Sequence, residues 1–438
     1  MRAPNIVLIV VDTLRNDFAG GLGSLVSSGF VQYENAIATS SWTLPSHASI
    51  FTGELPSVHG VHESLGIYDK RIASLSSDRL RKAESNLLRI LAARGYTSFC
   101  LTSNPYISQY FGFEFDLNYE FGPFGEIALP YNRDFSERKT MDTALSLLRK
   151  HRFGLLTRLA YNKERSAILA HSRRPQLEKG AKYILERLRS TTFVEPFFLF
   201  INLMEAHEPY FWNERNLDPL PHAILRRSLR ISNWKQAYRR HAELAISRAL
   251  EIIKIVKKLQ DPLIIVTSDH GQLLGEGGRF GHGYYLDDEL LRVPLYLRYP
   301  ASIKPPRKAG HFISLVELHK IIVAVSQDSE ARIGSDVVFS ESFGSPRDLS
   351  RLLTREDAQI LSKVYARRVK AFSGQGNIVY DVTHRIIDEI SRELSPKEVE
   401  HLTDTITSLQ VGDTNGPIPL TNDEEAIINQ RLKDLGYI

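Results

Sequence analysis

Continuous hydrophobic runs recur along the chain and alternate with amphipathic stretches. Three of the runs are rich in β-branched or aromatic residues and contain no alternating polar position: Asn5–Val11, Phe197–Leu203 and Pro262–Thr267. Runs of this kind are typical of strands buried on both faces. Such strands belong to parallel sheets covered by helices, so the pattern predicts an α/β fold with a mostly parallel central sheet sandwiched by helices.

Helical periodicity and further strands fill the space between these runs. Ser85–Ala93 has apolar residues at helical spacing and ends before a glycine, and a strand is expected directly afterwards at Thr97–Thr102. Leu315–Ser326 predicts a later helix. The aromatic and glycine-rich residues 110–135 predict an irregular loop, and a surface loop is expected around His59.

The carboxyl-terminal part differs in pattern from the rest. Short alternating strands and two amphipathic helices are expected there, over Val337–Ser340, Lys363–Phe372, Asn377–Asp381, Pro396–Leu409 and Asp423–Leu435. A turn of glycine and polar residues joins the last two strands and predicts a hairpin. We therefore expect a catalytic α/β domain over residues 1–333 and a small antiparallel α+β subdomain over residues 334–438.

Composition excludes several classes of protein. The chain has 438 residues, 42% of them hydrophobic, and a formal net charge of +4, which suits a globular protein with a sizeable core. No apolar run reaches the ~20 residues that a transmembrane helix needs. A single cysteine cannot form an internal disulfide, and no signal-peptide pattern opens the chain, so a cytoplasmic location is expected.

Basic residues gather in two stretches, 136–189 and 226–240. No zinc motif or interleaved aromatic residue accompanies them, so we expect solvated helix faces and no nucleic-acid partner. An alternative is a lid that steers anionic substrates or touches acidic lipid.

Polar side chains follow two of the predicted buried strands. Asp12 comes directly after the first strand, and Asp269 and His270 follow the strand at 262–267. The carboxyl ends of parallel strands meet at one edge of a sheet, where ligands of α/β proteins collect. Carboxylates suit hard cations, and an imidazole also admits zinc or manganese. The sequence therefore predicts a divalent-metal site, with calcium, manganese, magnesium and zinc all open.

The stretch Ser41–Gly53 predicts a short helix with an unusual start. Pro45 suits the first turn of a helix, and Thr43 is expected just before the helix begins. A threonine there is either an ordinary N-cap or a nucleophile, because backbone N–H groups at a helix N-terminus favour an anionic ester. The residues of this stretch alone leave both interpretations open.

Taken in order, these motifs resemble the sulfatases and their phosphoryl-transferring relatives in the alkaline phosphatase superfamily. The resemblance covers most of the chain. It rests on the opening strand with Asp12, on Thr43-Leu44-Pro45-Ser46-His47, on Met204-Glu205-Ala206-His207-Glu208-Pro209-Tyr210, on Ser268-Asp269-His270-Gly271 and on Gly281-His282-Gly283. It implies a metal held by Asp12, Thr43, Asp269 and His270, catalytic roles for Thr43, His207 and His282, and substrate binding by His47 and Asn104.

Departures from the family pattern narrow the expected chemistry. Thr43 stands where sulfate-hydrolysing members carry a cysteine or serine that becomes formylglycine, and a threonine cannot yield that aldehyde because its β-carbon carries a methyl group. The superfamily's phosphodiesterases and phosphoglycerol transferases resemble this chain in having threonine there. His47 replaces the usual arginine. A second metal ion is also open, because Glu205, His207 and His282 could form another site.

The expected function is that of a metal-dependent hydrolase or transferase that acts on a phosphate ester, either a monoester or a diester, through a covalent intermediate on Thr43. One alternative is a sulfuric ester hydrolase that works without formylglycine. The other is a catalytically silent anion-binding protein on the same scaffold. The expected partner is an anionic ester, with an acidic lipid or a glycan as candidate carriers of it.

Overall fold

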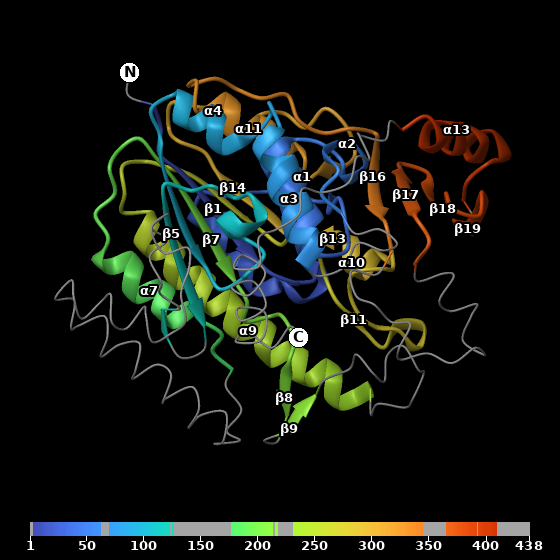
Figure 1. The fold of residues 1–438 in the computed structure, drawn as a ribbon, viewed down its shortest axis with the longest axis horizontal. Coiled ribbons are helices and arrows are strands. Elements are labelled where there is room, and N and C mark those ends of the chain that lie inside the picture. Colours follow the sequence, from blue (N-terminus) through green and yellow to red (C-terminus); the bar gives the residue numbers. More distant parts are fainter. Residues whose placement is uncertain are drawn as a thin grey trace.

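An eight-stranded sheet forms the centre of the molecule. The computed structural model describes residues 3–62, 70–122, 125–126, 177–212, 215–217, 231–344, 365–391 and 393–409. The strand order in the sheet is β2-β14-β10-β1-β7-β4-β5-β6, and helices cover both faces (Figure 1). The expected α/β class with a helix-covered, mostly parallel sheet is confirmed.

The four middle strands run parallel, and all four were predicted, three of them by the hydrophobic runs. They are β10 (Leu263–Thr267), β1 (Ile6–Val11), β7 (Phe197–Leu203) and β4 (Thr97–Thr102). Every residue of β1, β7 and β10 is buried, which explains why these segments are apolar throughout. Antiparallel strands close the two sides, namely β14 (Leu295–Arg298), β2 (Val31–Gln32) and β6 (Gly125–Glu126).

One prediction about the sheet is wrong. Residues 110–135 are not all irregular, because β5 (Leu117–Gly122) pairs in parallel with β4. Most of β5 is only partly buried, so its sequence lacks the continuous apolar run that marks the inner strands. Pairing with β4 determines its conformation, and that pairing leaves no local signal.

Two hydrophobic cores lie on the two faces of the sheet. On one face Leu8, Phe198 and Phe200 pack with side chains of α1 (Thr43–Thr52), α3 (Lys70–Lys82), α4 (Leu87–Ala93) and α11 (Glu317–Val325). On the other face, alternate residues of the same strands pack against α7 (Ala181–Ser190) and α9 (Ile231–Val256). The predicted helices at 85–93 and 315–326 are thus confirmed as α4 and α11.

The remaining elements before the carboxyl-terminal sheet are short. They are η1 (Asn16–Phe18), η2 (Gly20–Ser28), β3 (Ala36–Ile37), α2 (Pro56–His59), η3 (Gln109–Phe111), β8 (Tyr210–Trp212), β9 (Arg215–Leu217), β11 (Leu273–Leu274), η5 (Glu276–Gly278), β12 (Phe280–Gly281), α10 (Asp288–Leu291), β13 (Arg292–Val293) and β15 (Ile313–Ser314).

The segment around His59 is helical and buried, against the expectation of a surface loop. It forms α2, and the imidazole of His59 lies within 3.1 Å of Ser49 Oγ on α1 through Nε2. The other ring nitrogen, Nδ1, accepts a hydrogen bond from the N–H of Val61. Packing of α2 against α1 buries this histidine, and a single turn of helix is too short to give a periodic sequence signal.

The carboxyl-terminal sheet is antiparallel, as expected. Its order is β16 (Val337–Ser342), β17 (Arg368–Ser373), β18 (Gly376–Asp381) and β19 (Ile386–Ile390), and α13 (Pro396–Thr407) packs on it. Val338, Phe372 and Val379 join the main core, whereas the opposite side chains pack with α13. The boundary between residues 333 and 334 stays a prediction, and the helix expected at 423–435 lies outside the described residues.

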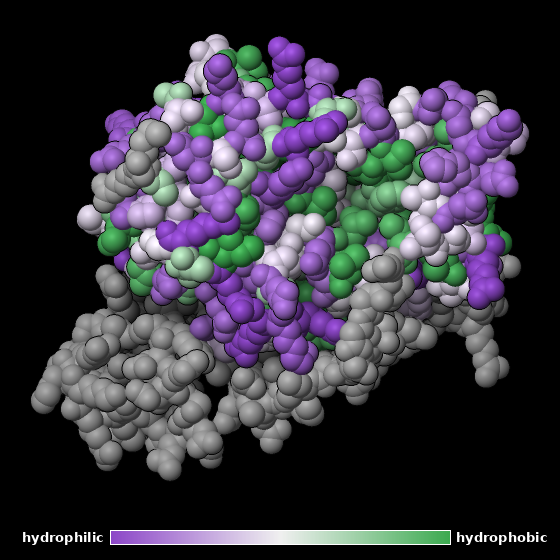
Figure 2. All heavy atoms as spheres, turned by 90° about the horizontal axis from the view of Figure 1, so that it is seen from above, coloured by the Kyte–Doolittle hydropathy of each residue, from purple (hydrophilic) through white to green (hydrophobic). Residues whose placement is uncertain are grey.

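One face of the molecule is largely hydrophilic among its described residues (Figure 2). Seen from above, polar and charged side chains cover most of it, with a more hydrophobic area between them (Figure 2). Among the described residues, none of the helices is both long enough and apolar enough to span a membrane. Most of the basic stretch at 136–189 lies outside the described residues, so the lid hypothesis and the location in the cell stay predictions.

Candidate active site

The register of neighbouring strands brings Asp12 and Asp269 together. Val10 of β1 is paired with Thr267 of β10, and each aspartate follows two residues later. The N–H of Asp12 donates to the carbonyl oxygen of Leu203 on β7, on the other side of β1. The two carboxyl groups therefore meet at the carboxyl edge of the parallel sheet, where the sequence placed them.

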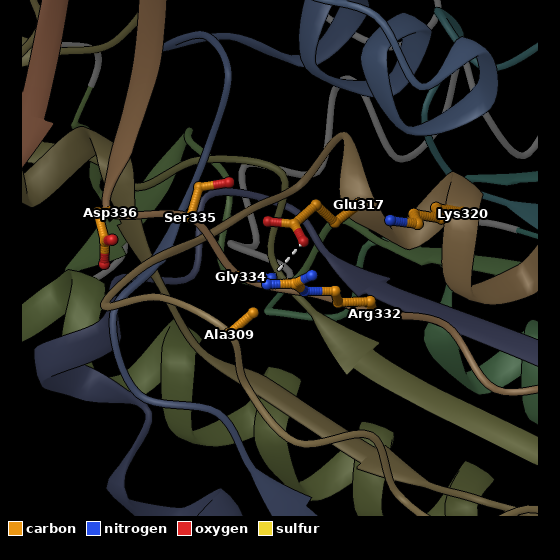
Figure 3. Close-up of a pocket in the computed structure, with 7 residues that line it drawn as sticks. All are labelled: Ala309, Glu317, Lys320, Arg332, Gly334, Ser335 and Asp336. Carbon is orange, nitrogen blue, oxygen red and sulfur yellow. Dashed lines mark hydrogen bonds between the residues drawn. The ribbon is translucent and has the colours of Figure 1, made fainter.

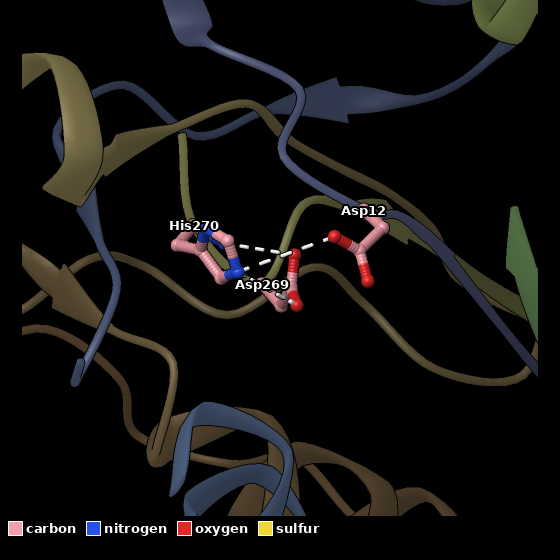
Figure 4. A group of neighbouring side chains, drawn as sticks. All are labelled: Asp12, Asp269 and His270. Atoms are coloured by element: carbon pink, nitrogen blue, oxygen red, sulfur yellow. Dashed lines mark hydrogen bonds and ion pairs between the residues drawn. The ribbon is translucent and has the colours of Figure 1, made fainter. Parts of the chain in front are cut away.

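Asp12, Asp269 and His270 form a compact group of buried ligand atoms (Figure 4). One atom from each residue lies within 4.8 Å of the other two. Nε2 of His270 is 3.4 Å from Asp269 Oδ2 and 4.0 Å from Asp12 Oδ1. All three side chains are fully buried.

The hydrogen bonds of the two carboxylates leave one oxygen of each without a partner. Asp269 Oδ1 accepts the backbone N–H groups of Thr13 and His270, and Asp12 Oδ2 accepts the side-chain amide of Asn104 at 2.7 Å. The remaining oxygens, Asp12 Oδ1 and Asp269 Oδ2, are buried and have no hydrogen-bond partner. They are the two oxygens nearest His270 Nε2, so the donor set fits a divalent cation.

Burial dominates the electrostatics of this group. Loss of solvation raises the pKa of Asp12 to about 7, and the neighbouring Asp269 carboxylate adds to the rise. Loss of solvation likewise raises the pKa of Asp269 to about 7 and lowers the pKa of His270. A bound cation would reverse the first two effects, because its charge favours ionised carboxylates.

Thr43 lies directly beside the metal ligands. Its Oγ1 is 3.3 Å from Asp12 Oδ2, to which it donates, and 3.5 Å from Nε2 of His270. Helix α1 begins at Thr43 itself, with the extended residue Trp42 as its N-cap, so the structure shifts the expected cap by one position. The side chain of Trp42 makes no capping hydrogen bond. The hydroxyl of Thr43 points at the ligand group and does not cap the helix.

Ser46 anchors the start of α1 to the metal ligands. Its hydroxyl donates a 2.7 Å hydrogen bond to the carbonyl oxygen of Asp269. This bond joins the helix that carries Thr43 to the strand end that carries Asp269 and His270. Ser46 therefore has a positioning role that the sequence did not predict.

The loop after Asp12 has an unusual backbone conformation. Thr13 has φ of +59°, which is rare for a β-branched residue. This conformation turns the N–H of Thr13 toward Asp269 Oδ1, at 3.2 Å. The phenol of Tyr238 on α9 accepts from the N–H of Arg15 and donates to the carbonyl oxygen of Thr13, both at 2.8 Å. Strain of this kind persists where the surrounding contacts impose it.

Asn104 and His47 are both tied to the ligand group. The Nδ2 of Asn104 donates to Asp12, and its Oδ1 accepts the N–H of Tyr106 in the same loop as Asn104. His47 is fully buried, with Nδ1 2.8 Å from the carbonyl oxygen of Thr43 and 3.6 Å from Asp269 Oδ2. Its Nε2 has no hydrogen-bond partner, and burial lowers its pKa to about 3. Their predicted contacts with substrate stay predictions.

The ring of His282 lies against the rings of both His207 and His270. The ring centroids of His207 and His282 are 5.0 Å apart, and those of His270 and His282 are 4.8 Å apart. Nδ1 of His207 is 2.6 Å from the backbone carbonyl of Glu208, and Nδ1 of His270 is 2.8 Å from that of Gly271. A carbonyl oxygen can only accept, so in both rings Nδ1 carries the proton and Nε2 is the basic nitrogen of the neutral form.

Glu205 does not join a second metal group in the described structure. Its Oε1 accepts the N–H groups of Lys179 and Ala181, both at 2.9 Å, at the start of α7. The ammonium of Lys179 donates to the carbonyl oxygen of His207 and lies 3.5 Å from that of Glu205. Among the described residues, the Asp12, Asp269 and His270 group is the one found with suitable ligand spacing.

Besides Ser46, sequence reasoning missed three residues near the site, namely Lys179, Tyr238 and Gln272. Gln272 lies two positions after His270, and its proximity to that motif was the available signal. Lys179 and Tyr238 come from α7 and α9 regions whose sequences indicate only helices. Burial lowers the pKa of Lys179 to about 7, a consequence of tertiary packing that no local pattern reveals.

A hollow of about 440 Å³ lies away from these residues. Helix α11 contributes Glu317 and Lys320 to it, and the segment that follows this helix contributes Arg332 (Figure 3). The carboxylate of Glu317 already accepts the N–H groups of Ser314 and Gly334. None of its lining residues belongs to the candidate active site.

Comparison with known proteins relates the chain to sulfatases. The family model described as "Sulfatase" matches residues 4–326. A low-salt glycan biosynthesis sulfotransferase, Agl7, from Haloferax volcanii is 35% identical over 107 residues, which are 23% of this chain and 26% of that protein. The chain thus matches about a quarter of the length of that relative.

Solved structures share the fold at low sequence identity. A phosphonate monoester hydrolase from Silicibacter pomeroyi superposes with a TM-score of 0.57 at 14% identity, over 92% of this chain and 93% of that one. A 2-O GAG sulfatase superposes with a TM-score of 0.58 at 13% identity, over 92% and 90%. These likenesses extend over nearly the whole length of both chains.

Proposed function

The chain belongs to the sulfatase family, a family of ester-cleaving enzymes, and from this membership we propose that it cleaves or transfers a phosphate ester through a covalent intermediate on Thr43. The substrate is a phosphodiester or a phosphomonoester, in which the non-bridging oxygens carry the negative charge and phosphorus is the electrophile. A divalent metal held by Asp12, Thr43, Asp269 and His270 assists the reaction.

The observation that carries the proposal is the position of Thr43 Oγ1 beside Asp12 Oδ2 and His270 Nε2, at 3.3 and 3.5 Å. A nucleophile needs a neighbouring group that activates it and a positive environment for the group it attacks. Asp12 and His270 are the neighbouring groups that can activate Thr43. The N-terminus of α1, which begins at Thr43, supplies the positive environment. Threonine cannot become formylglycine, so its own hydroxyl is the nucleophile available at this position.

The proposed reaction is a double displacement. Thr43 Oγ1 forms a bond to phosphorus, and its proton leaves along the hydrogen bond to Asp12. The bond from phosphorus to the leaving oxygen breaks, and Nε2 of protonated His207 or His282 donates a proton to that oxygen. The same histidine then takes a proton from water or an acceptor alcohol, whose oxygen forms a bond to phosphorus. The bond from phosphorus to Thr43 Oγ1 breaks, Asp12 returns the proton to Oγ1, and the phosphoryl group leaves on the new oxygen. The metal, when bound, supplies charge stabilisation and lowers the pKa of the attacking hydroxyl.

A panel of aryl esters tests this proposal. The purified protein is incubated with an aryl phosphodiester, an aryl phosphomonoester and an aryl sulfate, each with and without added divalent metal. We expect metal-dependent release of the phenol from a phosphate ester and much slower release from the sulfate. Faster turnover of the sulfate would contradict the proposal, and absence of turnover of every ester would support a silent binding protein.

Transfer of a sulfuryl group is the second candidate, because the relative from Haloferax volcanii is named a sulfotransferase of glycan biosynthesis. Thr43 could form a sulfate ester and pass the group to a glycan hydroxyl without formylglycine. The discriminating measurement is the acceptor: transfer from an aryl sulfate to a sugar alcohol, with no hydrolysis, would favour this candidate over phosphate chemistry.

The role of His207 leads to a separate prediction. His207→Ala should slow phosphate esters that have poor leaving groups by about 10²-fold, because general acid catalysis is worth that much. Esters with activated leaving groups need little protonation and should lose far less. The measurement is kcat for a series of aryl phosphate esters whose phenol leaving groups increase in pKa.

His59→Ala is the matched control for loss of a buried imidazole away from the site. It should reduce turnover by a similar factor for every leaving group. An equal loss across the series for His207→Ala would mean that His207 binds substrate and does not donate a proton.

A further inference from the structure

We infer that Gln272 is a positioning residue that holds His282 in a single tautomer, with Nδ1 protonated and Nε2 as the nitrogen available for proton transfer. The structural part of this inference stands on contacts alone. Its catalytic consequence rests on the proposed function.

Gln272 is fully buried between two charged or titratable side chains. Its Nε2 donates a 2.9 Å hydrogen bond to Glu208 Oε2. Its Oε1 is 2.6 Å from Nδ1 of His282. The backbone carbonyl of Gln272 accepts from Arg15 at 3.1 Å, which fixes the main chain from which the amide extends.

These contacts determine the orientation of the amide and the position of the proton. An ionised carboxylate only accepts hydrogen bonds, so the NH₂ group of Gln272 must face Glu208. The oxygen of the amide must then face His282, and an oxygen can only accept. The proton between them therefore belongs to Nδ1 of His282.

Glu208 thereby determines which ring nitrogen carries the proton in both His207 and His282. Its side chain orients Gln272, which orients His282, and its backbone carbonyl accepts from Nδ1 of His207. In both rings Nε2 is left as the nitrogen that gains and loses the catalytic proton. The centroids of the two rings are 5.0 Å apart. In the other neutral tautomer of either ring, Nε2 would carry a hydrogen and would have no lone pair to accept a proton.

NMR of protein labelled in the histidine ring nitrogens tests the inference directly. At about pH 9 imidazoles are neutral, and the shifts of the two nitrogens report which one carries the proton. A His282→Asn variant identifies the signal. We expect the Nδ1–H tautomer in the unchanged protein and a large fraction of the Nε2–H tautomer in Gln272→Leu.

Two further variants separate positioning from general damage. Gln272→Glu keeps an acceptor oxygen next to Nδ1 and, when its other oxygen is protonated, a donor to Glu208, so it should retain the original tautomer. Asn86→Ala removes the side-chain cap of α4, where Asn86 accepts from the N–H groups of Leu88 and Arg89. It should lower the melting temperature of the protein and leave the His282 signal unchanged.

The same variants are then assayed for ester turnover. Gln272→Leu should lower kcat for poor leaving groups by about 10-fold to 100-fold with little change in KM, and Gln272→Glu should recover part of it. An Nε2–H signal in the unchanged protein, or an unaltered tautomer in Gln272→Leu, would overturn the inference. A shifted tautomer with no ester turnover in any variant would overturn only the proposed function.

Discussion

Thr43→Ala is expected to abolish nearly all ester turnover, with a loss of about 10³-fold or more, because it removes the attacking atom itself. Thr43→Ser should keep a measurable part, about a tenth, since the hydroxyl and its contact with Asp12 survive. The methyl group of Thr43 limits the rotamers of the side chain, so its loss lets the hydroxyl turn away. Both variants should fold, because neither removes a hydrogen bond that caps α1.

Acid quench during turnover gives the decisive measurement. Protein stopped in the steady state with a phosphodiester should carry a phosphoryl group on the peptide that contains residues 41–53, and fragmentation should place it on Thr43. Thr43→Ala should carry no such group.

The neighbouring serines provide the controls. Ser41 has a buried hydroxyl without a hydrogen-bond partner, so Ser41→Ala should be mild, as should Ser40→Ala. Ser46→Ala should weaken the attachment of α1 to Asp269 but should still form the adduct. A phosphoryl group on any serine, or near-normal activity of Thr43→Ala, would refute the mechanism while leaving the fold intact.

The parts of the fold that the sequence predicts are those whose side chains report their surroundings locally. β1, β7 and β10 are buried on both faces, so every position is apolar and the strands are visible in the sequence. Asp12 and Asp269 follow these strands directly, and parallel pairing alone brings them together. The candidate metal group could therefore be predicted without knowing any other contact.

The remaining parts depend on pairing between distant segments. β5 is recognised as a strand only through β4, and His59 is buried only because α2 packs on α1. Gln272 and Lys179 act through hydrogen bonds to Glu208 and to the carbonyl oxygen of His207. The place of Gln272 two positions after His270 indicates that it lies near the site, but it does not reveal these hydrogen bonds, because one glutamine or lysine in a polar segment is usually exposed.

Asp269→Asn is expected to remove most of the bound divalent metal. The structure gives Asp269 one oxygen that accepts two backbone N–H groups and one that lies unpaired beside His270. Replacing the carboxylate with an amide removes the negative charge that a hard cation requires and puts an NH₂ group in one of these positions. Metal content of the purified protein, measured by mass spectrometry, should fall from near one ion per chain to a small fraction.

Glu205→Gln is the matched control, because Glu205 is an equally buried carboxylate whose Oε1 accepts only the N–H groups at the start of α7. An amide oxygen can accept the same two bonds, so metal content should not change. His47→Ala should also keep most of the metal, because His47 is not one of the three residues of the ligand group.

Thermal unfolding gives a second measurement of the same assignment. A ligand at about 100 times its Kd stabilises a protein by about 2.7 kcal/mol, which for a chain of this size is a rise in Tm of several degrees. Added metal should raise the Tm of chelator-treated Glu205→Gln as it does that of the unchanged protein, and should not raise that of Asp269→Asn. Equal metal content and equal Tm shifts in Asp269→Asn and Glu205→Gln would show that the cation binds elsewhere, and the proposed activation of Thr43 would lose its basis.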